Sequence, residues 1–298
     1  MPSFISSSRP IAISAIAALV AYAAIIEIVR PKISFYPDQD AFNLVRAERY
    51  LLAGRPHDTV LLGSSLAVRI PDDWLPDDWL NLSFGGMGAQ TGLSLLRQPG
   101  SQLPRRVLIE INTFERETEP GFETAARGPI PLAVRRLVRA LRAEMRPVNV
   151  LLSAFGEART PPLLKRVGRG IDEACTALLT SSERDAVQTD VVARQVAGGA
   201  AAEQNADGLA IAARRVGDSI RALRARGVEV LLVELPVDPG LEGRVTARRQ
   251  ALAVAVPDAP IVRFDPAQFQ TEDGEHLAPL SARRFGCRLQ ARLAKPRT

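Results

Sequence analysis

The sequence predicts an α/β protein built on a central parallel sheet of about five strands, with a membrane-spanning helix at its N-terminus. Two observations predict the sheet. Five short aliphatic segments recur along the chain, and amphipathic helical patterns separate several of them. Alternation of strands and helices is typical of doubly wound parallel sheets. The third observation is an uncharged apolar run near the N-terminus, which predicts the additional helix.

The apolar run extends from Ile11 to Ile26, sixteen residues without a charge, and reaches Val29 if Glu27 lies at the membrane interface. This length is near the lower limit for a helix that crosses a bilayer. Charged residues and a proline follow it where a signal peptide would have a small-residue cleavage site. We therefore expect residues 1–32 to be an uncleaved signal anchor, with a buried hydrophobic helix as the alternative.

The anchor predicts a single-pass protein of the cell inner membrane. Basic residues stand on both sides of the run, at Arg9 on one side and at Arg30 and Lys32 on the other. The positive charges that normally set orientation are therefore balanced. We expect the remainder of the chain to lie on the extracytoplasmic, periplasmic side.

Residues 33–57 are predicted to be a connector, in which Pro37–Leu52 is amphipathic. The strand segments that follow are almost continuously aliphatic, as expected for strands covered on both faces. Helical periodicity predicts a helix over Gly88–Gln98 and another over Leu209–Arg226, which Gly227 ends. The predicted strands are Thr59–Leu62, Trp79–Phe84, Arg106–Asn112, Val228–Leu235 and Ile261–Phe264.

A basic helical insertion, at about residues 115–205, interrupts this alternation. From Arg127 to Arg169 there are ten Lys or Arg residues and two Glu, a balance of +8, whereas the whole chain carries +5. The high pI is therefore a property of the insertion. No aromatic interleaving and no recognised binding motif accompany the charge, so nucleic acid is not an expected partner. Ala197–Asp207 is predicted to be a flexible loop.

Within the insertion, Pro131–Pro147 is predicted to form one basic amphipathic helix. Two interpretations of it stay open: contact with anionic headgroups or a membrane partner, or packing of its apolar face on the main domain. The predicted apolar face is Val134, Leu137, Val138, Leu141 and Met145, with Arg135, Arg136, Arg139, Arg142 and Arg146 around the other side.

The cysteine and histidine content argues against a zinc site. The chain has two cysteines, Cys175 and Cys287, far apart in the sequence, and only two histidines. The cysteines are either buried thiols or a disulfide. We expect buried thiols, because spacing alone does not bring two Cα atoms within bridging distance.

Polar residues follow the predicted strands at their carboxyl ends, where open parallel sheets build their sites. They are Gly63, Ser64 and Ser65 after the first strand, Gly85 and Gly86 after the second, Asn112 at the end of the third, and Asp273 and His276 beyond the fifth. We therefore expect these side chains to meet at one edge of the sheet.

Each of these residue types fits one role in acyl transfer. A serine hydroxyl becomes a nucleophile when an imidazole accepts its proton, and a carboxylate fixes the imidazole's tautomer. Ser65 is the predicted nucleophile, His276 the base and Asp273 the group that orients it. The predicted oxyanion donors are the Ser65 N–H, Gly86 and Asn112. The other histidine, His57, precedes the first strand and belongs at the opposite edge.

The segments "GSSL", "NLSFGG", "EIN" and "DGEH" together resemble the four sequence blocks of the SGNH hydrolases, also called the GDSL esterase and lipase superfamily. The resemblance implies a flavodoxin-like three-layer α/β/α sandwich over residues 58–298, and a serine esterase without cofactor or metal. Ser64 stands where the family usually has an acid, and the third block keeps only Asn112.

The Gly-Ser-Ser block, the anchor and the insertion are similar to the envelope branch of that superfamily. This branch includes the alginate O-acetylation proteins and the D-alanyl lipoteichoic acid transfer protein, which work beside membrane-bound O-acyltransferases. The resemblance implies an esterase or O-acetyl transferase that acts on envelope or exported polysaccharide through an acyl-serine intermediate. A non-catalytic assembly or carbohydrate-binding protein that keeps the fold is the alternative.

Overall fold

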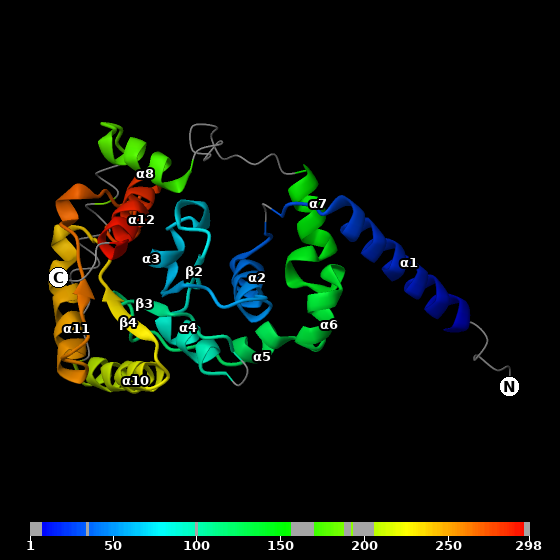
Figure 1. Ribbon diagram of the computed structural model, residues 1–298, viewed down its shortest axis with the longest axis horizontal. Helices are drawn as coiled ribbons and strands as arrows, with labels where there is room; N and C mark the ends of the chain where they lie inside the picture. The colour runs from blue at the N-terminus through cyan, green and yellow to red at the C-terminus, as the bar shows by residue number, and fades with distance from the viewer. Residues whose placement is uncertain are drawn as a thin grey trace. The chain divides into compact units, whose positions relative to one another are not determined.

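The computed structural model describes residues 8–33, 36–98, 101–155, 170–187, 192 and 206–294 (Figure 1). The chain divides into two compact units. The first contains residues 1–52 and 123–161, and the second contains residues 53–122 and 162–298. The first half of the predicted insertion therefore belongs with the N-terminal helices, and the sheet belongs to the second unit.

The second unit is built on a five-stranded, all-parallel sheet in the order β2-β1-β3-β4-β5. This is the order of doubly wound, flavodoxin-like sheets, whose direction of winding reverses between β1 and β3. The predicted parallel sheet is confirmed. Its strands are β1 (Thr59–Leu62), β2 (Trp79–Asn81), β3 (Arg106–Glu110), β4 (Glu229–Val233) and β5 (Ile261–Val262).

Four of the five predicted strands end earlier than expected. The backbones of three of them nevertheless continue to pair with a neighbouring segment: the Phe84 N–H donates to the Gly63 carbonyl, the Ile111 N–H to the Val233 carbonyl and the Glu234 N–H to the Val262 carbonyl. The carboxyl ends of β1, β2, β3 and β4 are thereby held together where the candidate site lies.

Both faces of the sheet are covered, as the aliphatic strands predict. On one face, Leu61 and Leu108 belong to a buried cluster with Leu66 of α3 (Ser65–Val68) and Phe285 of α12 (Pro279–Ala294). On the other face, a Cβ at Gly92 of α4 (Ala89–Leu96) would lie 2.7 Å from a methyl of Leu62. The described residues of this unit also form α8 (Ile171–Thr180), α10 (Ala206–Arg224) and α11 (Glu242–Ala255).

A disulfide joins Cys175 of α8 to Cys287 of α12, with their Cα atoms 5.3 Å apart. The expectation of buried thiols is therefore wrong. Sequence spacing gave no sign that the two helices meet. The bond lies in a small buried cluster with Trp74, Ala174 and Leu178.

The first unit contains the predicted anchor as α1 (Ser8–Val29). Its stretch Pro10–Val29, 20 residues with a mean hydropathy of 2.3, is long and apolar enough to cross a membrane. Most of its large apolar side chains are exposed, so it is not the buried core helix considered as the alternative. The other helices here are α2 (Gln39–Leu51), α5 (Phe122–Arg127), α6 (Leu132–Leu137) and α7 (Pro147–Phe155).

The prediction of a single basic helix over Pro131–Pro147 is wrong. The segment forms α6 and then two 3₁₀ turns, Arg139–Leu141 and Ala143–Met145, separated by extended residues at Val138 and Arg142. The physical reason is a buried ion pair. Arg135 is 5% exposed and its Nη1 lies 2.6 Å from Oε1 of Glu48 on α2, which is 2% exposed.

The same carboxylate also accepts the Ala143 N–H, so it holds both α6 and the second 3₁₀ turn against α2. Burial raises the pKa of Glu48, and the Ala143 and Arg135 hydrogen bonds partly offset that rise. The predicted loop over Ala197–Asp207 falls outside the described residues up to residue 205, and Ala206 and Asp207 begin α10.

Candidate active site

Ser65 is presented by a tight strand-to-helix turn. β1 ends at Leu62, Ser64 caps α3, and Ser65 is the first residue of that helix. The Ser64 hydroxyl accepts the Leu66 N–H at 3.2 Å. A Cβ at Gly63 would lie 2.6 Å from the Cβ of Ala67 and 3.0 Å from Oε2 of Glu110. Only glycine fits there, because the helix begins directly against the strand.

The structure brings Ser65, His276 and Asp273 into one chain of hydrogen bonds. Nε2 of His276 lies 3.0 Å from Oγ of Ser65, and Nδ1 of His276 lies 2.6 Å from Oδ2 of Asp273. The His276 and Asp273 side chains are 23% and 31% exposed. These distances are within the range expected of a nucleophile, its base and the group that orients the base.

The loop that carries His276 is fixed by hydrogen bonds to its backbone groups. Oδ1 of Asp273 accepts the N–H groups of Glu275 and His276, and Gly274 adopts a φ of +90° that favours glycine. The His276 carbonyl accepts the Glu272 N–H at 2.8 Å. The Gly274 carbonyl also accepts the Asp238 N–H, which ties the loop to the segment that follows β4. The imidazole is therefore oriented by a rigid turn.

The same hydrogen bonds set the protonation state of Asp273. Partial burial raises the pKa of this carboxyl, but hydrogen bonds from the His276 backbone and ring and from the Glu275 N–H outweigh that effect. The pKa lies below its ordinary value of 3.8. Asp273 is consequently ionised at neutral pH, which is the form that accepts a proton-bearing Nδ1 of His276.

The predicted oxyanion donors are placed differently from one another. Gly86 is exposed and has a φ of +75°, a conformation that favours glycine. Asn112 is 2% exposed, and its amide bonds the backbone of Leu235 in both directions, donating to the carbonyl at 2.9 Å and accepting the N–H at 2.8 Å. Only the second Nδ2 hydrogen of Asn112 could serve an oxyanion. The oxyanion roles stay predictions.

Glu110 lies directly beneath the nucleophile turn, and sequence reasoning missed its role. It is completely buried, and its Oε2 accepts the Ser64 N–H at 2.8 Å and the Ser64 hydroxyl at 2.7 Å. Its other oxygen, Oε1, accepts the Thr113 N–H at 2.9 Å. Burial raises the pKa of Glu110, and the hydrogen bonds from Ser64 and Thr113 oppose the rise. One signal was available: an acid ends an otherwise aliphatic strand, and a buried carboxylate needs partners.

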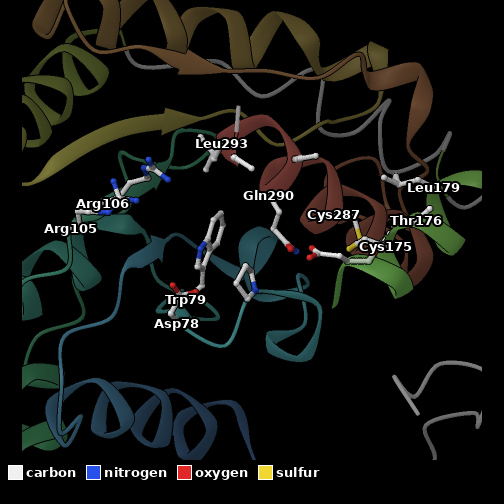
Figure 2. Close-up of a pocket in the computed structure, with 14 residues that line it drawn as sticks. Asp78, Trp79, Arg105, Arg106, Cys175, Thr176, Leu179, Cys287, Gln290 and Leu293 are labelled. Carbon is white, nitrogen blue, oxygen red and sulfur yellow. Dashed lines mark hydrogen bonds between the residues drawn. A yellow bond between two sulfur atoms is a disulfide. The ribbon is translucent and has the colours of Figure 1, made fainter. Parts of the chain in front are cut away.

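A cavity of about 570 Å³ lies at the opposite edge of the sheet (Figure 2). Trp79 and Arg106 line it at the start of β2 and β3, whereas Ser65 follows the carboxyl end of β1. Cys175, Cys287 and Gln290 also line it. His57 precedes β1 and belongs to this edge too, which leaves His276 as the base available to Ser65.

Comparisons with protein-family models, with curated proteins and with solved structures find no match. Among the residues that the structure describes, no group of three or more His, Cys, Asp and Glu side chains could hold a metal ion.

Proposed function

We propose that this chain is a membrane-anchored serine esterase or O-acyltransferase of the SGNH type, with the three-layer α/β/α sandwich of that superfamily in its second unit. The observation that carries the proposal is the hydrogen-bonded chain from Ser65 through His276 to Asp273. Its position also supports the proposal, because ligands of doubly wound sheets bind where the winding reverses, here between β1 and β3.

In the proposed reaction, Oγ of Ser65 attacks the carbonyl carbon of an ester while Nε2 of His276 takes the hydroxyl proton. Asp273 holds the imidazole and stabilises its positive charge. The oxyanion that forms is stabilised by N–H donors, for which the Ser65 N–H, Gly86 and the second Nδ2 hydrogen of Asn112 are the candidates. The tetrahedral intermediate then collapses, and the alcohol leaves with the proton from His276. The acyl group remains on Ser65.

The second half of the reaction decides between the two activities. His276 takes a proton from water in an esterase, or from an acceptor hydroxyl in an O-acyltransferase, and the resulting oxygen attacks the acyl carbon of acyl-Ser65. The bond from that carbon to Oγ of Ser65 then breaks, Oγ takes the proton back from His276, and the acid or the new ester leaves. By resemblance to the envelope branch, the acceptor is a sugar hydroxyl of an envelope or exported polysaccharide. A membrane-bound O-acyltransferase is the proposed partner that supplies the acyl group.

The location that we propose is the extracytoplasmic side of the inner membrane. The α1 helix supports anchoring, since it is apolar enough to span a bilayer. The Cys175–Cys287 disulfide supports the oxidising side, because such bonds are rare in the cytosol.

The decisive experiment is labelling of the purified protein with a serine-directed fluorophosphonate. We expect wild type to be labelled and Ser65→Ala to take up no label. Ser64→Ala is the matched control and should still be labelled. Equal labelling of wild type and Ser65→Ala would overturn the assignment. Acetate release from an acetyl ester, with and without added polysaccharide, then separates hydrolysis from transfer.

The second candidate is a non-catalytic carbohydrate-binding or assembly protein. The observation in its favour is the cavity beside Trp79, which combines an aromatic ring with the polar side chains of Gln290 and Asp172. If a cell lacking the protein is complemented by Ser65→Ala and His276→Ala but not by Trp79→Ala, this candidate replaces the enzyme.

A further inference from the structure

We propose that α7 is a second membrane contact, which inserts its apolar face into the outer part of the bilayer beside α1. This inference depends on α1 being in a membrane and is independent of the proposed chemistry. All of its residues belong to the first unit.

The sequence of α7, PVNVLLSAF, carries no charge, and seven of its nine residues are apolar; the exceptions are Asn149 and Ser153. Three large side chains spaced along one face are left in solvent: Val148 is 46% exposed, Leu151 is 56% exposed and Phe155 is 84% exposed. Adjacent apolar side chains with this exposure mark an interaction site on a protein surface.

The opposite side of α7 is fastened to the first unit. Asn149 is completely buried, and its Nδ2 donates to the Ala143 carbonyl at 3.1 Å. The 3₁₀ turn Ala143–Met145 is in turn bonded to α1, because the Tyr22 hydroxyl donates to the Met145 carbonyl. The exposed face is therefore held at a fixed place relative to α1.

The position of that attachment along α1 indicates the depth. The apolar stretch Pro10–Val29 has 20 residues. At a rise of about 1.5 Å per residue it is about 30 Å long and has no surplus over the hydrocarbon core. Ile26 is completely buried, and Tyr22 bonds the turn that precedes α7. Along the helix axis these two residues lie about 5 to 10 Å from the Val29 end of the stretch. This is the depth at which the apolar faces of interfacial helices are buried.

The charges around α7 fit a lipid surface. Arg146 is exposed and immediately precedes α7, and Arg139 lies in the first 3₁₀ turn, whereas Arg142 between the turns donates to the carbonyls of Arg135 and Arg136. Long basic side chains beside an interfacial helix can reach anionic headgroups while their stems stay in apolar surroundings. A helix without charge, with the exposed Arg146 directly before it, fits a bilayer containing anionic lipid.

The test uses the full chain reconstituted into vesicles of phosphatidylcholine and phosphatidylglycerol. An environment-sensitive nitrobenzoxadiazole dye is attached to Leu151→Cys or, separately, to Phe155→Cys. The two native cysteines are joined and do not react. The matched control is Ala125→Cys, an exposed position on α5 of the same unit. Lipids that carry a nitroxide on the upper acyl chain are then added as quenchers.

We expect blue-shifted emission at residues 151 and 155, loss of most of it to the nitroxide lipids, and water-like, unquenched emission at residue 125. Water-like emission at both 151 and 155 would overturn the proposal. Blue-shifted emission that the nitroxide lipids leave unquenched would also overturn it, because the occupant would then be protein. Equal quenching at residue 125 would mean general adsorption and not insertion of α7.

Discussion

Ser64 and Ser65 are adjacent and chemically identical, but their surroundings give them different tasks. The Ser65 hydroxyl meets His276, whereas the Ser64 hydroxyl is buried, donates to Glu110 and accepts the Leu66 N–H. Ser64 therefore links the acid on β3 to the first turn of α3.

Ser64→Ala removes the hydroxyl and leaves the buried Glu110 with one donor fewer. We expect the free energy of unfolding to fall by about 1 to 3 kcal/mol, because the buried Leu66 N–H also loses its acceptor. Labelling at Ser65 should persist, as a slower reaction. Urea denaturation and the rate of fluorophosphonate labelling check the two parts. An unchanged stability would mean that the Ser64–Glu110 bond is not formed in solution.

Asp273→Asn tests the carboxylate behind His276. The pKa of Asp273 is lowered in the folded protein, so its ionised form contributes stability at pH values above the ordinary 3.8, and this contribution is lost as the pH falls through the folded pKa. We expect wild type to be more stable than Asp273→Asn at neutral pH and the difference to shrink below about pH 4. Unfolding measured from acid to neutral pH checks this.

The same substitution should leave His276 in the wrong tautomer. We expect a loss of about 10⁴-fold in ester hydrolysis, the size of the equivalent effect in serine proteases. A variant with wild-type activity would contradict the role of Asp273, whatever its stability.

At the scale of elements, the sheet is where prediction from sequence succeeded. Short aliphatic segments such as Thr59–Leu62 are typical of strands that are buried on both faces of a parallel sheet. Parallel strands also place their carboxyl ends at one edge of the sheet. The meeting of Ser65 with His276 could be anticipated for that reason, since the other histidine precedes the first strand.

Prediction failed where a distant partner decides the local structure. The periodicity of residues 131–147 is helical, but Glu48, far away in the sequence, captures Arg135 and the Ala143 N–H and breaks the helix into turns. The contact of Glu110 with Ser64 and the Cys175–Cys287 bond have the same character. A single sequence carries no local sign of such pairings.

Asn112 connects two elements, since its amide joins the end of β3 to Leu235 beyond β4. We expect Asn112→Ala to lower the free energy of unfolding by about 1 to 3 kcal/mol, because the Leu235 N–H and carbonyl lose their partners. If that link is its main role, the labelling rate of the folded variant should change by less than about tenfold. A fall of 10² to 10³ would instead establish Asn112 as an oxyanion donor.

At the scale of the whole molecule, the chain has one unit that contains the apolar helix α1 and a second unit that holds the candidate site. The disulfide belongs entirely to the second unit, where it joins α8, which lies within the predicted insertion, to α12. The residues between the two cysteines include β4, β5 and the His276 loop.

The double substitution Cys175→Ala, Cys287→Ala removes a cross-link between positions 112 residues apart in the sequence. We expect the second unit to lose about 2 to 4 kcal/mol of unfolding free energy. Urea denaturation of the double variant should match that of reduced wild type. Two free thiols in the native, unreduced protein would contradict the bond.

The contact between Glu110 and the nucleophile turn limits which substitutions positions 64 and 110 can accept. Glu110 is encoded 46 residues away from the serine that it supports, so a short signature centred on Gly63-Ser64-Ser65 cannot record it. Carboxylates at positions 64 and 110 together would repel each other in this buried place. A turn with no carboxylate at either position would lack the charged acceptor that Glu110 now provides. We therefore expect Ser64→Asp to be tolerated best together with Glu110→Gln. The double variant keeps one carboxylate at this place but moves it from the strand to the turn.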